Sequence, residues 1–358
     1  MIQFVLKRIS YGFLVLAGVV TVVFLLFNVL PGDPARMLMG QRADEESLKI
    51  IQKDLGLDQP LSKQFVMYVN DLTPLSFHDK NPEHYLFLDA DKYNYTELFS
   101  YGESSVAVLK TPYLRRSYTT KRKVSETLID YMLETAILAL ASIIIASILG
   151  VIFGIIAALR KDSWVDRSLL FVSVLGMSVP SFYSAIILSW LFGYVLSEYT
   201  GLNMTGSLFV YDDLGNGEMI QLQNLILPAL TLGVRPVSAI MQLTRSSMLD
   251  VMSQDYIRTA RAKGLTFSAV VIKHALKNAL NPVTTAISGM FASLLAGALF
   301  VEWIYGWKGI GWVLFDALQR FDLPIVMGGV LLTATIFVVI NILVDIIYGL
   351  LDPRVRVK

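Results

Sequence analysis

The sequence predicts an all-α protein that crosses a membrane several times. Hydrophobic residues make up 54% of the 358 residues and charged residues only 16%, a balance unlike that of soluble domains. Apolar stretches of about 20 residues, long enough to cross a bilayer as a helix, recur along the whole chain. The net charge of +1 argues against nucleic acid as a partner, and the lack of cysteine excludes disulfides and thiol-bound metals.

Six apolar stretches are the predicted membrane spans. They cover residues 9–30, 133–159, 169–196, 225–243, 284–301 and 325–351. The first follows Lys7 and Arg8, as in a signal peptide, but it is too long for one and ends without a cleavage pattern. We therefore expect residues 1–30 to be a retained anchor helix. Pro180 and Pro228 lie inside spans and are expected to bend them around a central cavity.

Lysine and arginine gather in the short connections on one side of the predicted membrane. These residues are Lys7, Arg8, Arg160, Lys161, Arg167, Arg245, Arg258, Arg261, Lys263, Lys273, Lys277, Arg354, Arg356 and Lys358. Positive charge favours the cytoplasmic side. Both termini, the tail 352–358 and the loop 245–283 are therefore predicted to be cytoplasmic.

Residues 31–132, between the first two spans, are expected to form an extracytoplasmic region. PGDPA at 31–35 predicts a sharp turn. Two short amphipathic helices are expected next, on the apolar residues Leu48, Ile51, Leu55, Phe65, Tyr68, Val69 and Leu72. Around 75–112 the composition becomes aromatic and charged, and a small folded insert is expected because long structureless loops are uncommon.

The longest polar segment between spans is YIRTARAKGLTFSAVVIKHALKNALNPV, residues 256–283. It predicts a short helix capped by Ser253 or Asp255, a turn at Gly264, and a second helix with an apolar face. That face is expected to hold Ile272, Ala275, Leu276 and Ala279. Such a segment can be an anchor that meets lipid headgroups, or a docking site. The small residues Ala260, Ala262 and Gly264 favour docking in a partner's groove.

Arg235 is placed near the middle of the fourth span, where a charge must face protein or water. It either pairs with an acid or with carbonyls freed by Pro236, or it lines a pathway and meets a substrate carboxylate. Trp303 and Trp307 lie in a glycine-rich corner before the last span, as interface anchors or as part of an outer gate. Asp345, near the end of the last span, is interpreted as structural.

Several contiguous motifs of this sequence are long enough to be specific. DYIRTARAKGL (255–265) followed by HALKNALNPV (274–283) is similar to the EAA loop of ABC importer permeases, in the form seen in the oligopeptide and dipeptide (nickel) family. Further matches are FNVLPGDPA, LGLDQPL, AALRKDSWVDR, GMSVPSF, ILPALTLG, EWIYGWKGIGWVL and LVDIIYGLLDPRVR. Transporters of this family contain two permease subunits. The chain resembles the first of them, which has a long connection after its first span. The insert near 75–112 departs from the family pattern.

The resemblance implies a type I ABC importer permease fold of six transmembrane helices, with a five-helix core over 133–351. It implies ATP-driven import of di- or oligopeptides in a bacterial inner membrane. The coupling segment would comprise Asp255, Tyr256, Arg258, Ala260, Arg261, Ala262, Lys263, Gly264 and Leu265. The implied partners are a second permease forming a heterodimer, two cytoplasmic ATPase subunits and an extracytoplasmic substrate-binding protein, besides membrane lipid.

No catalytic residue, cofactor or metal site is predicted for this chain. It has no GxxxxGK[ST] loop, so ATP hydrolysis is expected in separate chains. A membrane enzyme is the least favoured class of function, after an ATP-driven permease and a secondary transporter or channel, because GxSxG and HExxH are absent. Within the resemblance, Arg235, Pro180, Trp303 and Trp307 are candidate pathway residues. Nickel chelates or another small solute stay open as cargo. A non-ABC secondary transporter or channel is the rival, although it should carry more ionisable residues in its spans.

Overall fold

The computed structural model describes residues 2–29, 58–82, 84–102, 104–211, 217–296 and 298–351. The predicted turn at 31–35, the first amphipathic helix and the tail 352–358 lie outside these ranges. Two compact units are present: one contains Met1–Ile9, Tyr131–Phe315 and Ile336–Lys358, the other Ser10–Asp130 and Asp316–Thr335. Each unit is described by itself.

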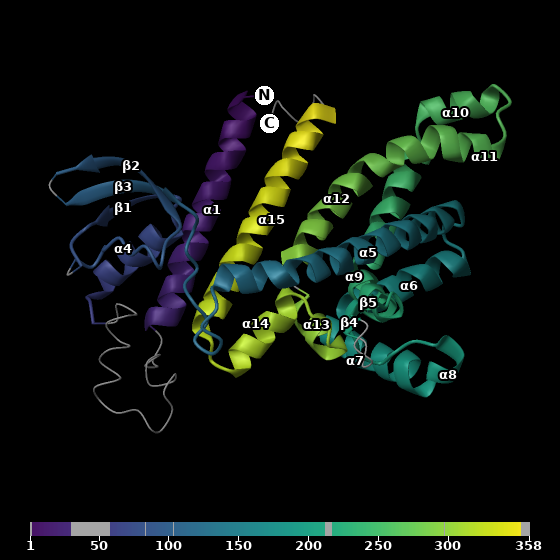
Figure 1. Cartoon of the computed structure of the whole chain (residues 1–358). Helices are drawn as coiled ribbons and strands as arrows, with labels where there is room; N and C mark the ends of the chain where they lie inside the picture. The colour runs from purple at the N-terminus through teal and green to yellow at the C-terminus, as the bar shows by residue number, and fades with distance from the viewer. Residues whose placement is uncertain are drawn as a thin grey trace. The chain divides into compact units, whose positions relative to one another are not determined.

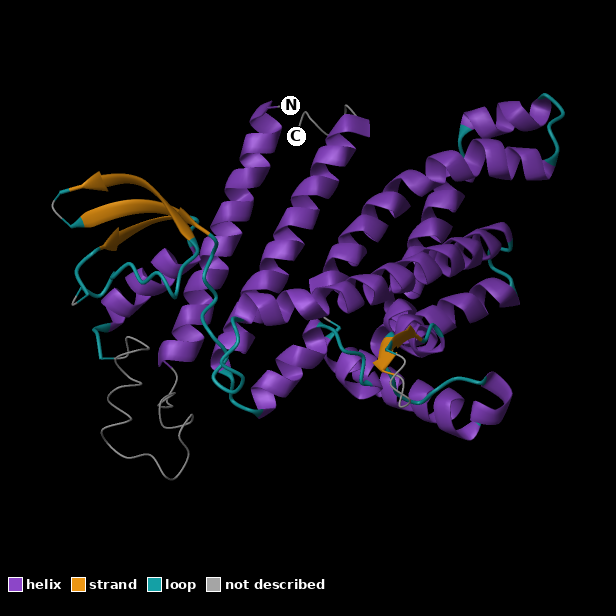
Figure 2. Ribbon diagram, in the orientation of Figure 1, coloured by secondary structure: helices purple, strands orange, loops and turns teal. Residues whose placement is uncertain are grey.

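Helices dominate both units, and strands are confined to two small sheets (Figures 1 and 2). The helices are α1 (Ile2–Val29), α4 (Leu61–Leu72), α5 (Val124–Leu159), α6 (Trp164–Ser178), α7 (Ser181–Trp190), α8 (Ser197–Thr200), α9 (Gln223–Met252), α10 (Asp255–Ala262), α11 (Phe267–Ala269), α12 (Lys277–Ala296), α13 (Leu299–Tyr305), α14 (Ile310–Gln319) and α15 (Leu323–Leu351). Two π-helical segments are η2 (Leu191–Val195) and η3 (Val270–Leu276). The strands are β1 (Leu75–Asp79), β2 (Tyr95–Tyr101), β3 (Ser105–Lys110), β4 (Phe209–Tyr211) and β5 (Glu218–Ile220).

Four helices among the described residues are long and apolar enough to cross a membrane, and six spans result if each of two bent pairs counts as one. The four belong to α1, α5, α9 and α15. The third predicted span, 169–196, is not continuous, because the helices before and after Val179 and Pro180 meet at 107°. Proline lacks an N–H and disfavours helix at the preceding residue, and Val179 is accordingly extended. By contrast, α9 continues through Pro228 and Pro236.

Close helix contacts hold the larger unit together around α9. A Cβ on Gly154 of α5 would come within 2.5 Å of the Thr244 Cβ, and one on Gly150 within 2.8 Å of the Ile240 Cβ. These two glycines, four residues apart, let α5 approach α9 as small residues do in membrane helix pairs. The unit also joins the two ends of the chain, since Arg8 Nε lies 3.1 Å from Asp345 Oδ2. Asp345 is therefore a structural partner, as predicted.

The smaller unit packs α4 against α1 and carries a three-stranded sheet. The Phe24 ring of α1 lies 5.0 Å from the Phe65 ring and 5.7 Å from the Tyr68 ring, centroid to centroid. Both ring partners are on α4, the second amphipathic helix that the sequence predicts. Antiparallel pairing gives the strand order β1–β3–β2, so the region predicted as a small folded insert contains this sheet. Whether the insert is atypical of the family stays a prediction.

Candidate functional site

The segment 255–276 forms a helical hairpin at the connected ends of α9 and α12 (Figure 1), which we name the basic hairpin. Helix α10 ends at Ala262, and Gly264 then adopts φ +77°, a conformation that glycine tolerates best. Thr266 starts the return by accepting a hydrogen bond from the Ala269 N–H on its side chain. Gln254 occupies the N-cap of α10 and makes no side-chain cap, so the caps predicted on Ser253 or Asp255 are not formed.

Ala260 does not belong to the exposed side of the hairpin. Together with Ile257 it is buried in a cluster with Met248, Val270 and Ala275. The small side chain thus lets α10 pack against its own chain, and the sequence-based role of Ala260 in close approach to a partner is corrected. Ala262 and Gly264 are exposed, and a Cβ on Gly264 would meet open space.

The exposed side of the hairpin combines positive charge with apolar groups. Its exposed residues within the predicted coupling segment are Asp255, Tyr256, Arg258, Arg261, Ala262, Lys263, Gly264 and Leu265. Phe267, which the sequence reasoning left out, adds a large exposed ring beside Leu265 in the chain. The Tyr256 hydroxyl is held by a hydrogen bond from the Asn278 amide, 2.8 Å away. Basic residues around exposed rings suit a protein groove with an acidic rim.

The second arm of the hairpin differs from its predicted register. Ile272, expected on the apolar face, is 64% exposed, while Val270, Val271, Ala275 and Ala279 are buried. The reason is the π-helical segment η3, which places more residues in each turn than an α-helix. Helical spacing of 3.6 residues therefore assigns the wrong side to Ile272.

A cavity of about 360 Å³ lies among α6, α7, α9 and α12, a volume within the range of small-molecule pockets. Its lining residues are Met177, Ser181, Thr231, Leu232, Arg235, Pro236, Ala239, Met290, Ser293 and Leu294. Among these described residues, Arg235 is the only charged one. Pro180 is not among them, but it precedes Ser181 and sets the break at which α7 begins.

Arg235 is held by a backbone carbonyl. Its Nη2 lies 3.5 Å from the Met177 oxygen, and no carboxylate of the described residues lies within ion-pair distance of it. Met177 is in the last turn of α6, where carbonyls lose their intrahelical donors. The partner is thus a carbonyl freed by the break at Pro180, whereas the sequence suggested one freed by Pro236. The guanidinium stays exposed in the cavity wall.

Three contacts along α6 and α9 connect the cavity with the start of the basic hairpin. Arg245 of α9 donates two hydrogen bonds to the Asp166 carboxylate of α6, at 2.6 and 2.7 Å. One to two turns further, Gln242 donates to the Ser173 hydroxyl at 2.8 Å. At Gly176 a Cβ would lie 2.7 Å from the Ser238 oxygen, so the helices touch there. This pairing is not apparent from the sequence, in which Arg245 contributes only to the positive charge of a predicted cytoplasmic loop and Asp166 is one residue of the motif AALRKDSWVDR.

The corner before the last span is organised around a buried carboxylate. Glu302 accepts hydrogen bonds from the Gly311 N–H at 2.7 Å, the Trp312 N–H at 3.2 Å and the Thr135 hydroxyl at 2.9 Å. Gly309 must be a glycine here, since a Cβ would come within 2.4 Å of the carboxylate. This corner therefore has a fixed shape.

The two tryptophans of that corner have different surroundings. Trp307 is fully buried and donates its indole N–H to the Glu134 carbonyl at 3.0 Å, so it does not line the cavity. Its predicted place on the pathway is corrected by this burial. Trp303 is exposed, and its ring lies 4.2 Å from the Phe315 ring. Trp303 alone of the pair can meet a passing molecule.

Comparison with known proteins gives two family matches. The family described as "Binding-protein-dependent transport system inner membrane component" matches residues 150–357. The family described as "Binding-prot-dependent transport system membrane comp, N-term" matches residues 1–80. Residues 81–149, which contain β2 and β3, lie between the two matches.

Curated relatives align over nearly the full length. The dipeptide transport system permease protein DppB of Alkalihalophilus pseudofirmus is 32% identical, covering 99% of this chain and 100% of the relative. The di/tripeptide transport system permease protein DppB of Pseudomonas aeruginosa is 34% identical, with 99% of each chain covered. The glutathione transport system permease protein GsiC of Salmonella typhimurium is 34% identical, with 100% of each covered. The spans, the basic hairpin and these matches agree: the chain belongs to the inner membrane components of binding-protein-dependent transport systems, the multi-pass permease subunits of ABC importers.

Proposed function

We propose that this permease subunit moves short peptides and that its basic hairpin receives the motion of a separate ATPase. The observation that carries the coupling role is the exposed side of the hairpin, where Arg258, Arg261 and Lys263 surround exposed apolar groups. The buried side, with Ile257 and Ala260, fastens the hairpin to α9 and η3. A displacement of the hairpin by the ATPase therefore moves the attached spans as a rigid body.

The route from the hairpin to the cavity is the contact line between α6 and α9. Asp166 and Arg245 stand at its hairpin end, and Arg235 with Met177 at its cavity end. Since both helices are tied at several levels, a displacement of α9 carries α6 with it and changes the cavity wall. ATP hydrolysis takes place in separate chains, because this sequence contains no GxxxxGK[ST] loop.

Peptides are the proposed cargo for two reasons. The relatives are named for dipeptide, di/tripeptide and glutathione transport. Among its lining residues the cavity presents one cation, Arg235, together with hydroxyl, thioether and aliphatic groups. A free peptide brings a C-terminal carboxylate, which a guanidinium binds well. Since no carboxylate of the described residues pairs with Arg235, its charge is available for such a group.

The proposed assembly is a heterodimer with a second permease, two ATPase subunits and a substrate-binding protein on the other side of the membrane. The hairpin and both chain ends are then cytoplasmic. Family membership supports a binding protein and ATPases as partners, and the positive charge of the hairpin supports its side of the membrane.

Co-purification tests the coupling role. The tagged chain is isolated in mild detergent from membranes that contain the whole transporter, and every accompanying chain is identified. The variant Arg258→Glu with Arg261→Glu reverses two exposed charges of the hairpin, and Arg160→Glu with Lys161→Glu reverses two exposed charges elsewhere. We expect the ATPases to be lost from the first variant and kept by the second. Equal retention in both variants would refute the docking role.

A further inference from the structure

Strand β1 of the smaller unit's sheet alternates in the opposite sense to a strand of a sheet in water. Antiparallel sheets with one solvated face place apolar residues inside and polar residues outside. In β1, however, Ser76 and His78 are buried, while Leu75 is 52% and Phe77 is 48% exposed. The apolar side chains of this strand point away from its own core.

The same side of the sheet is apolar across all three strands. Leu75 pairs with Leu109 of β3, and Phe77 and Phe99 flank Ala107 from the two edge strands. Tyr101 completes the group, with its ring 5.9 Å from that of Phe77. We name Leu75, Phe77, Phe99, Tyr101 and Leu109 the apolar sheet face. Phe99, Leu109 and Tyr101 are 58%, 51% and 43% exposed, an area too continuous to be scattered surface residues.

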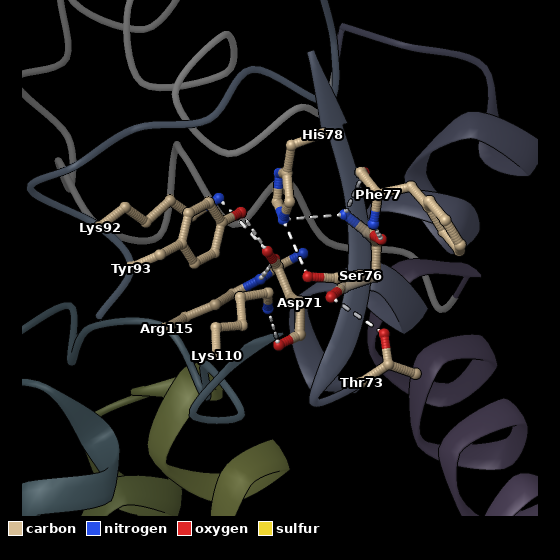
Figure 3. Close-up of polar contacts among 10 residues, drawn as sticks. Asp71, Thr73, Ser76, Phe77, His78, Lys92, Tyr93, Lys110 and Arg115 are labelled. Atoms are coloured by element: carbon tan, nitrogen blue, oxygen red, sulfur yellow. Dashed lines mark hydrogen bonds and ion pairs between the residues drawn. The ribbon is translucent and has the colours of Figure 1, made fainter. Parts of the chain in front are cut away.

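The opposite side of the sheet is covered by a polar cluster around Asp71 (Figure 3) and by an apolar cluster of Leu88, Tyr93, Val106 and Val108. The Tyr93 hydroxyl donates to the Asp71 carboxylate at 2.6 Å, and the Lys110 ammonium donates to the Asp71 backbone oxygen at 2.7 Å. His78 points into this cluster and Phe77 away from it, as Figure 3 shows. Because a strand has a period of two, burial of the polar set forces the apolar set outwards. The exposure of the apolar sheet face is therefore built into the register.

The sheet is held close to a membrane span. Helix α4 contacts Val19, Val20, Val23, Phe24 and Phe27 of α1 through a shared apolar cluster. These residues belong to the segment Gln3–Phe27 that is apolar enough to cross the membrane. Strand β1 begins three residues after Leu72 of that cluster, a distance of at most about 10 Å along an extended chain. The hydrogen bond from the Tyr113 N–H to the Asp71 oxygen, 2.8 Å, pins the end of the insert to the same helix.

We propose that the apolar sheet face rests on the lipid of the membrane surface beside α1. Its five residues are aromatic or aliphatic, the composition that partitions into the boundary between headgroups and acyl chains. The only charged residue of β1–β3 on that side is Asp79, at the end of β1 that is far from α4. The sheet thus extends the lipid contact of α1 and fixes the insert against the bilayer.

The lack of cysteine allows a direct test by single-cysteine labelling. Phe99→Cys places an environment-sensitive fluorophore on the apolar sheet face. Ser100→Cys places it one residue away, on the opposite side of the same strand and exposed. The complete transporter is reconstituted in lipid nanodiscs, with and without nitroxide on the acyl chains. Leu109→Cys provides a second position on the face.

We expect lipid nitroxide to quench positions 99 and 109 at least about twofold more than position 100, because alternate residues of a strand face opposite sides. Equal quenching at 99 and 100, or none at 99 and 109, would overturn the proposal. The proposal would also be overturned if the fluorophore at position 99 left the aqueous environment only after addition of the substrate-binding protein, because the apolar sheet face would then contact a protein. Peptide uptake and ATPase co-purification by the labelled transporter show that the chain is folded.

Discussion

Arg235 illustrates how a single residue acquires a role from a helix break elsewhere. Its guanidinium is oriented by the Met177 carbonyl, which is free because α6 ends just before Pro180. No carboxylate of the described chain neutralises it, and the surrounding cavity excludes part of the solvent. In the proposed function this cation binds an anionic group of the cargo.

Replacement of Arg235 by glutamine is expected to reduce uptake of peptides with a free C-terminal carboxylate by about tenfold or more, the loss of one charge-assisted hydrogen bond. Uptake of C-terminally amidated peptides should change much less. Transport assays in proteoliposomes with both peptide forms measure the difference. Ser293→Ala, in the same cavity wall, is the matched control. An equal loss for both peptide forms would show that Arg235 acts on structure.

His78 makes the insert sensitive to acid. Burial is the main cause that lowers the pKa of His78 to about 4, followed by the nearby Lys110 charge. A backbone hydrogen bond with Leu86 and the Asp71 charge raise this pKa by smaller amounts, and the Lys92 charge lowers it slightly. The unfolded chain takes up a proton near the ordinary pKa of 6.5. Stability from neutral His78 is therefore complete above about pH 6.5 and is lost as the pH falls towards 4.

Hydrogen exchange of β1 and β3 at pH 7 and pH 5, corrected for the intrinsic rates, measures this effect. We expect weaker protection at pH 5 in the normal chain and a much smaller pH dependence in His78→Gln. His84→Gln, in the same insert, should retain the normal dependence. Protection that does not change between the two pH values would contradict the assignment.

At the scale of elements, α6 and α9 are joined by contacts at several positions, which the proposed coupling uses. Asp166 and Arg245 are largely buried and form two short hydrogen bonds, so the pair resists separation more than a surface ion pair does. Arg245 lies in the last third of α9, towards the basic hairpin, so in the proposed coupling a movement of α9 also moves α6. The close approach of α5 through Gly150 and Gly154 adds a third helix to this body.

Asp166→Asn is expected to lower peptide uptake by about tenfold while the ATPases still co-purify, because an unpaired Arg245 loosens α6 from α9. The exchanged pair Asp166→Arg with Arg245→Asp should recover part of the uptake. The exposed pair of Arg122 and Asp130 supplies the control, since Asp130→Asn should have little effect. Loss of the protein from the membrane in Asp166→Asn, without recovery in the exchanged pair, would indicate a folding role only.

For the whole molecule, the ends of the chain bear on its topology. Arg8, near the start of α1, pairs with Asp345, near the end of α15. This contact is what the proposed topology requires, in which the start of α1 and the end of α15 lie on the same side of the membrane. In that proposed topology, the distribution of lysine and arginine assigns this side and the basic hairpin to the cytoplasm.

Single cysteines in the cysteine-free chain test this arrangement. A membrane-impermeant maleimide is expected to label Ser268→Cys, exposed on the hairpin, only when the cytoplasmic face is open. Ser100→Cys in the insert should be labelled from the opposite face. Labelling of intact spheroplasts and of inverted vesicles, followed by mass measurement, distinguishes the faces. Reaction of both positions from the same side would exclude the proposed topology.

The all-α class, the approximate positions of the spans and the location of the basic hairpin were predictable from the sequence by itself. Each depends on local information: the length of an apolar run, the placement of charge, or a contiguous motif such as DYIRTARAKGL. Only the tertiary structure showed which side each residue faces. Ala260 and Trp307 turned out to be buried, Ile272 exposed, and Asp166 paired with Arg245, 79 residues away in the chain. Periodicity predicts a face only while the helix or strand stays regular and its partners are known, and π-turns, proline breaks and buried polar clusters alter both conditions.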